Sequence, residues 1–136
     1  MTNPPRAAAM RAASLITAIN VLVATGFSIA GILSPQSIVS AADPPNRASL
    51  IFALYAAART IPLALFALAA IYKQAVVPLM ILGALAGVMQ LLDAGVGLVQ
   101  GDFSKTIGPL VIATLQFAAL SYLYSAKPLP SARRAI

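Results

Sequence analysis

The stretch that decides the fold is Leu50–Ile71, LIFALYAAARTIPLALFALAAI, an apolar segment with one cation, Arg59, near its middle. A helix of about 20 predominantly apolar residues is long enough to cross a bilayer. An Arg at the bilayer centre costs about 2.5 to 3.5 kcal/mol on insertion scales, so such residues face the bundle interior and pair with an acid. The only acid within any other apolar segment is Asp93. The stretch therefore predicts a transmembrane helix that shares a polar site with another.

The composition is that of an integral membrane protein. Of the 136 residues, 60% are hydrophobic and 9% are charged, whereas soluble domains have roughly 45 to 50% apolar and about 25% charged residues. We expect a single membrane domain over residues 1–136, because four spans of about 20 residues each use most of the chain. Topology and anionic lipid headgroups explain the net charge of +6, so nucleic acid is not an expected partner.

The chain has few groups that support cofactor chemistry. It contains no Cys and no His, and its three acids are all Asp: Asp43, Asp93 and Asp102. This composition excludes thiol-disulfide chemistry, ordinary haem and iron-sulfur ligation, and most zinc sites. We expect no cofactor and no metal.

Four apolar segments separated by short turns predict an all-α, antiparallel four-transmembrane-helix bundle. They cover residues 12–33, 48–72, 75–99 and 106–124. Asn46 to Ser49 has the residues that open a helix. Lys73-Gln74 is a very tight turn, so the second and third segments should form a hairpin. Gly108-Pro109 falls in the first turn of the fourth segment, where Pro is tolerated.

The region before residue 12 is expected to be a mobile tail. A rival interpretation takes Arg6 and Arg11 as the start of a secretory signal peptide, with Val39-Ser40-Ala41 as its cleavage site. The apolar core of such a peptide has about 7 to 15 residues. The run here covers residues 12–33 and is interrupted by Asn20, which favours a membrane span.

Positive charge gathers on one side of the bundle when both termini are placed together. Six cations then oppose two: Arg6, Arg11, Lys73, Lys127, Arg133 and Arg134 against Arg47 and Lys105. Loops on the cytoplasmic side carry an excess of Lys and Arg. We therefore expect a protein of the bacterial inner membrane with both termini in the cytoplasm.

The polar residues of the segments fall at a similar depth. Arg59 lies about 17 Å and Asp93 about 9 Å below the outer ends of their segments, and the Arg side chain leans outward. We expect a bidentate ion pair between them. The other candidates lie within about 10 to 20 Å of the outer boundary: Asn20, Tyr55, Gln90 and Gln116. This set predicts either a network that fixes helix packing or a polar cavity that binds a ligand.

Spacing gives further expectations for these side chains. Gln90 and Asp93 are three residues apart, and Tyr55 and Arg59 are four apart, so each pair should share a helix face.

Glycines mark where the third segment approaches its neighbours. Gly83 and Gly87 form a small-xxx-small motif, which indicates either packing within the bundle or a dimer face. Gly95 and Gly97 are expected to lie near the polar site and to let the helix ends part.

Two stretches resemble the DoxX-like group of small bacterial four-helix membrane proteins. They are LYAAARTIPLAL around Arg59 and QLLDAGVGLVQGD around Asp93, followed by a fourth segment that begins near Thr106-Ile107-Gly108-Pro109. The likeness runs from about Ala12 to Tyr124 and implies a compact four-helix bundle. Members of the group are sometimes associated with membrane redox or quinone-linked systems, but this chain has no redox ligand of its own.

Three functions stay open. In the first, Arg59 holds an anionic or carbonyl group of a lipid-like or small-molecule ligand and Asp93 orients it, in a binding protein or a subunit of a membrane complex. The second is a membrane enzyme with Asp93 as general acid or base, supported by Tyr55 or Arg59. The third is a purely structural or assembly role. The expected partners are membrane lipid, a small-molecule ligand, and further copies of the chain or another protein of a complex.

Overall fold

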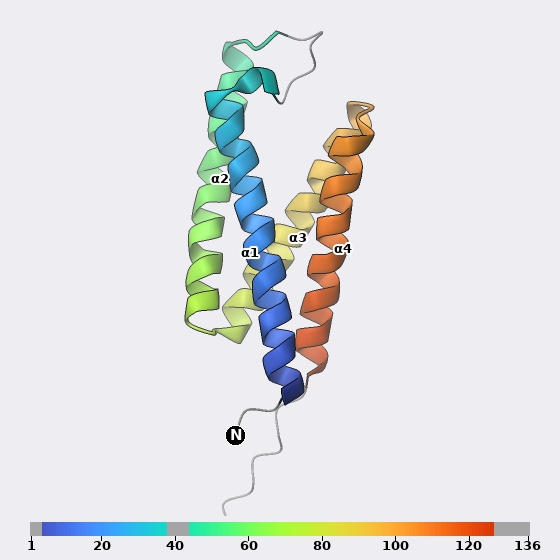
Figure 1. Ribbon diagram of the computed structural model, residues 1–136. Coiled ribbons are helices and arrows are strands. Elements are labelled where there is room, and N and C mark those ends of the chain that lie inside the picture. Colours follow the sequence, from blue (N-terminus) through green and yellow to red (C-terminus); the bar gives the residue numbers. More distant parts are fainter. Residues whose placement is uncertain (1–3, 38–43, 127–136) are drawn as a thin grey trace, which may run out of the picture.

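The computed structural model describes residues 4–37 and 44–126 and confirms an all-α bundle of four helices (Figure 1). The elements are α1 at Pro4–Leu33, a short 3-10 helix η1 at Pro35–Ser37, α2 at Arg47–Tyr72, α3 at Val76–Val99 and α4 at Phe103–Ser125. Each of the four α-helices is long and apolar enough to cross a membrane. The chain is therefore a multi-pass membrane protein. The considered cleavage site at residues 39–41 and the basic tail after residue 126 lie outside the described residues.

Helix α1 begins at Pro4, not at Ala12, so the prediction of a mobile tail was wrong for residues 4–11. Proline is compatible with the first helical turn, and Ala7–Ala9 has the highest intrinsic helix propensity. Ala9 and Met10 are buried against the other helices. Helix propensity and packing of small side chains extend α1 here, whereas the prediction used only the limits of the apolar run.

A core shared by all four helices lies at the end where α1 starts, α4 ends and α2 turns into α3 (Figure 1). Its buried residues are Ala9, Met10, Ala13, Ala70, Leu79, Leu120 and Leu123. A second cluster joins only α1, α2 and α3, with Val21, Leu63, Ala64, Ala67 and Ala86. From their hairpin, α2 and α3 diverge toward the opposite end of the bundle (Figure 1). The two charged candidates lie on these diverging helices.

Side-chain hydrogen bonds fix where α2 begins. Asn46 Oδ1 accepts from the Ser49 amide at 2.9 Å, and Ser49 Oγ accepts from the Asn46 amide at 3.0 Å. This reciprocal arrangement is a capping box. It confirms that Asn46 to Ser49 opens the helix.

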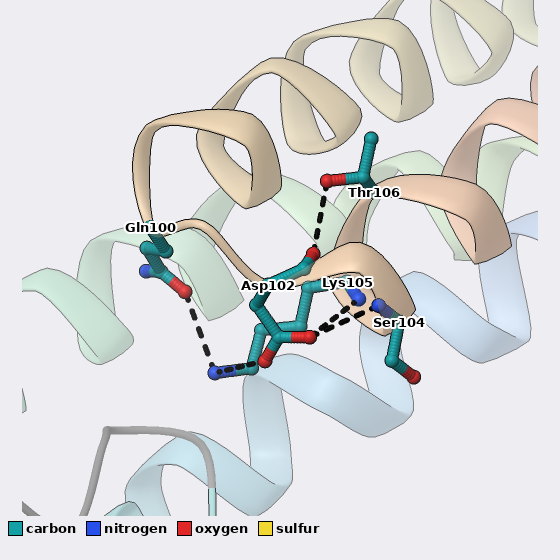
Figure 2. A network of polar contacts seen from close by, with 5 residues as sticks. All are labelled: Gln100, Asp102, Ser104, Lys105 and Thr106. Carbon is teal, nitrogen blue, oxygen red and sulfur yellow. Dashed lines mark hydrogen bonds and ion pairs between the residues drawn. The ribbon is translucent and has the colours of Figure 1, made fainter.

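Asp102 caps α4, which starts at Phe103 and not near Thr106 as predicted. Figure 2 shows its carboxylate accepting from the amides of Ser104 at 3.0 Å and Lys105 at 3.2 Å. Lys105 Nζ also lies 3.4 Å from Asp102 Oδ2. The hydrogen bond from the Lys105 amide favours the ionised carboxylate and lowers the pKa of Asp102 below its ordinary value of 3.8. The earlier start places Pro109 inside the helix, beyond its first turn.

Candidate functional site

A chain of buried amides crosses the interior of the bundle. Gln90 Nε2 donates to Asn20 Oδ1 at 2.8 Å, and Asn20 Nδ2 donates to Gln116 Oε1 at 3.2 Å. Gln116 Nε2 then donates to Thr17 Oγ1 at 2.9 Å. All four side chains are buried, and they come from α1, α3 and α4. The structure thus brings together three of the six predicted residues and adds Thr17, which the sequence analysis missed. We call these four residues the amide cluster.

Glycines on α3 make room for the amide cluster. A Cβ atom at Gly83 would lie 2.8 Å from Gln116 Nε2 and 3.1 Å from Thr17 Oγ1. A Cβ atom at Gly87 would lie 2.9 Å from the ring of Phe117 on α4. The small-xxx-small motif therefore serves packing within one bundle, which was one of its two predicted roles.

Hydroxyl groups, not amides, join α2 to α1. Thr60 Oγ1 donates to Ser28 Oγ at 3.0 Å, and Thr25 Oγ1 donates to the carbonyl oxygen of Thr60 at 3.3 Å. Thr60 is buried on the side of α2 that faces α1. Because consecutive helical residues are turned by about 100°, the preceding residue, Arg59, points in a different direction from Thr60.

Arg59 and Asp93 line the same hollow between α2 and α3. The hollow has a volume of about 450 Å³, and its other walls are Leu63, Leu85, Met89 and Leu92. Both charged side chains are exposed. They lie well inside helices that span the membrane, so their exposed surfaces face the apolar part of the bilayer or whatever fills the hollow. We call this feature the α2–α3 hollow.

The predicted ion pair between Arg59 and Asp93 is not formed. Within residues 4–37 and 44–126, the pair that lies within 4.0 Å is Lys105 and Asp102. Neither Arg59 nor Asp93 has a hydrogen bond or ion pair in this part of the chain. The physical reason is the divergence of α2 and α3, which carries the two side chains to different walls of the hollow.

The predicted shared face of Gln90 and Asp93 is only partly realised. Three residues along a helix correspond to about 300°, which leaves the two side chains about 60° apart. Gln90 is 3% exposed and belongs to the amide cluster, whereas Asp93 is exposed at the hollow. Tyr55 is 58% exposed and belongs to neither group. The six candidates therefore divide into an interior set, a lateral pair and one separate tyrosine.

Gly97 does not flank the hollow in the way the sequence suggested. A Cβ atom there would lie 2.6 Å from the carbonyl carbon of Lys105 and 2.7 Å from the amide nitrogen of Thr106, both on the backbone of α4. Gly97 thus holds the ends of α3 and α4 together. Gly95, two residues earlier, has nothing within 4 Å of such an atom.

The two groups of polar residues differ in what they offer to another molecule. Asn20 and Gln116 each use both the oxygen and the nitrogen of the side-chain amide inside the cluster. These polar groups of the interior are therefore hydrogen-bonded to one another. The α2–α3 hollow instead presents one cation and one anion on apolar walls, open to the side of the bundle. The hollow is therefore the place where charged side chains lie exposed beside apolar ones.

Comparisons with family models, with curated proteins and with solved structures each give no match. The resemblance to the DoxX-like group therefore stays a prediction based on the stretches around Arg59 and Asp93.

Proposed function

We propose that this chain is a binding subunit of a membrane-embedded assembly and that the α2–α3 hollow receives a transmembrane segment of its partner. The observation that supports the proposal is the pair of intramembrane charges, Arg59 and Asp93, which line the hollow and have no partner within the described residues. Charges at this depth pair with one another or mark functional sites. A partner segment with complementary groups pairs with both Arg59 and Asp93.

The apolar walls of the hollow suit a helix as the occupant. Leu85, Met89 and Leu92 follow one another at spacings of four and three residues on α3 and form a ridge. In lipid, helices associate through close packing and interhelical polar contacts, since the bilayer itself is apolar. The hollow supplies both kinds of contact.

A second candidate is an amphiphilic, lipid-like ligand, which the size of the hollow favours. Its volume of about 450 Å³ falls within the roughly 300 to 1,000 Å³ typical of small-molecule sites. In this arrangement, Arg59 binds an anionic headgroup and the leucine walls contact its apolar part.

The proposal includes an orientation in the bacterial inner membrane. Both described ends of the bundle, at Pro4 and Ser125, lie on the same side as the hairpin that contains Lys73 (Figure 1). The excess of positive charge on this side supports a cytoplasmic location for it. The α2–α3 hollow then lies near the middle of the membrane, because Arg59 is close to the midpoint of α2 and Leu85 and Asp93 lie on either side of the midpoint of α3. This arrangement is consistent with membership of the DoxX-like group.

Photocrosslinking in native membranes tests the proposed site. A photoreactive amino acid at Leu85, in the hollow, is compared with one at Leu115 on α4, because both leucines are 50% exposed. We expect Leu85 to form a discrete adduct with a protein, and we expect Arg59→Gln to reduce that adduct severalfold. The adducts are identified by mass spectrometry.

The control position separates a specific site from general exposure to the bilayer. Leu115 should yield lipid adducts only. A protein adduct of equal yield at both positions contradicts the proposed site. A lipid adduct at Leu85 that depends on Arg59 supports the second candidate.

A further inference from the structure

We infer that the occupant of the α2–α3 hollow is a second copy of this chain, with Arg59 of each copy paired to Asp93 of the other. The inference rests on the proposed function, because it names the partner for the same hollow. It is carried by the charges of the hollow, by their depth, and by the packing surfaces that the bundle leaves available.

The charges of the hollow complement a second hollow of the same kind. Each copy contributes one guanidinium and one carboxylate to this surface, from Arg59 on α2 and Asp93 on α3. In an interface with two-fold symmetry, a contact of one residue with another is repeated in reverse. Two copies thus form two identical ion pairs and leave neither charge alone. A single chain does not form this pair within 4.0 Å among its described residues.

The depth of the two residues agrees with this symmetry. Copies inserted with the same topology are related by an axis along the membrane normal, and rotation about this axis leaves the depth of every residue unchanged. Arg59 and Asp93 line one hollow and therefore lie at compatible levels. Since α2 and α3 line the hollow from its two sides, the rotation sets α2 of one copy against α3 of the other.

The remaining surfaces direct the second copy to this face. Gly83, Gly87 and Gly97 are used against α4 within the bundle, so these three glycines of α3 are not available to another chain. Leu85 and Leu92, exposed at 50% and 67%, form the ridge beside Asp93. Packing of this ridge against its symmetry mate adds van der Waals contact to the charge pairs.

Charge reversal in separate chains tests the reciprocal pairs. Arg59→Asp leaves a chain with two acids at the hollow, and Asp93→Arg leaves a chain with two bases. Each variant alone should self-associate about a hundredfold or more weakly than the wild type, because like charges then face each other. Co-expressed with different affinity tags, the two variants should form a mixed dimer. The readouts are reciprocal tag capture and subunit counting in lipid vesicles.

Three further samples make the result decisive. The double variant with Arg59→Asp and Asp93→Arg in one chain should dimerise like the wild type. Lys73→Asp, an exposed charge in the hairpin, should also leave dimerisation unchanged. Helix content measured by circular dichroism confirms that each reversed chain is folded. If a reversed chain does not fold, Arg59→Gln and Asp93→Asn replace the reversals, and each should weaken self-association.

The outcomes separate this inference from the proposed function. Restoration by the double variant but not by the mixture overturns the inference, because the pair then forms within one chain. A wild-type chain that stays monomeric in vesicles, or a dimer that tolerates both reversals, overturns it as well. In either of these last cases, an Arg59-dependent adduct from Leu85 to a different protein still supports the proposed function.

Discussion

Replacing Gln116 with Leu is expected to lower the free energy of unfolding by about 2 to 4 kcal/mol. Gln116 is fully buried and joins Asn20 to Thr17 through two side-chain hydrogen bonds. The substitution removes both bonds and leaves the Asn20 amide donor in an apolar interior. Unfolding in mixed micelles measures the loss.

The matched control lies two residues away on the same helix. Thr114 is exposed, and its hydroxyl donates to the Leu110 carbonyl of its own helix at 2.8 Å. Thr114→Val should change the stability by less than about 0.5 kcal/mol. Combining Asn20→Leu with Gln116→Leu should cost less than the sum of the single losses, because the two residues share a hydrogen bond. Equal effects of Gln116→Leu and Thr114→Val contradict a structural role for the amide cluster.

Substitutions at two neighbouring glycines of α3 should have opposite effects. Gly97→Ala places a methyl group 2.6 Å from the backbone of α4 at Lys105, and neither helix backbone yields without displacing the α3–α4 turn. Overpacking of this kind costs about 1 to 3 kcal/mol. Gly95→Ala meets nothing within 4 Å and should stabilise the helix by up to about 1 kcal/mol, because Ala has the higher helix propensity.

The same unfolding experiment in mixed micelles measures both glycine variants. A Gly97→Ala variant as stable as Gly95→Ala shows that α3 and α4 do not meet closely at this position. The comparison is independent of the polar residues, since neither glycine is in the amide cluster or the hollow.

The sequence predicts the fold class because hydropathy and turn residues alone set the number and order of the helices. It also predicts that Asn20, Gln90 and Gln116 lie near one level, since the depth of a residue follows directly from its place in a span. Thr17 gives no such signal. A hydroxyl in a transmembrane helix satisfies itself on its own backbone as readily as on a neighbour.

Depth does not determine the direction in which a side chain points around its helix. All faces of these four helices are apolar, so no polar face marks the outside of the bundle and the periodicity of a soluble helix is missing. For this reason, the level of Arg59 and Asp93 follows from the sequence, but their placement on two walls of a lateral hollow does not. The ridge of Leu85, Met89 and Leu92 is hidden in the same way among other apolar residues.

The start of α4 shows a different kind of missed signal. Asp102 is a preferred N-cap residue, and its position directly before Phe103 was available in the sequence. The prediction that the fourth helix begins near Thr106 placed Phe103 to Lys105 in the loop, because it gave more weight to polar residues than to the capping residue. The cap instead adds these residues to the helix.

The central claim is that Arg59 contacts a molecule outside its own bundle, whereas the amide cluster holds the helices of the bundle together. The most direct measurement is the free energy of unfolding of Arg59→Gln in detergent, at a dilution that keeps the chain monomeric. We predict a value within about 0.5 kcal/mol of the wild type, because Arg59 is exposed and has no partner among the described residues. A loss of about 3 to 5 kcal/mol, as expected when a buried ion pair is broken, would contradict the claim.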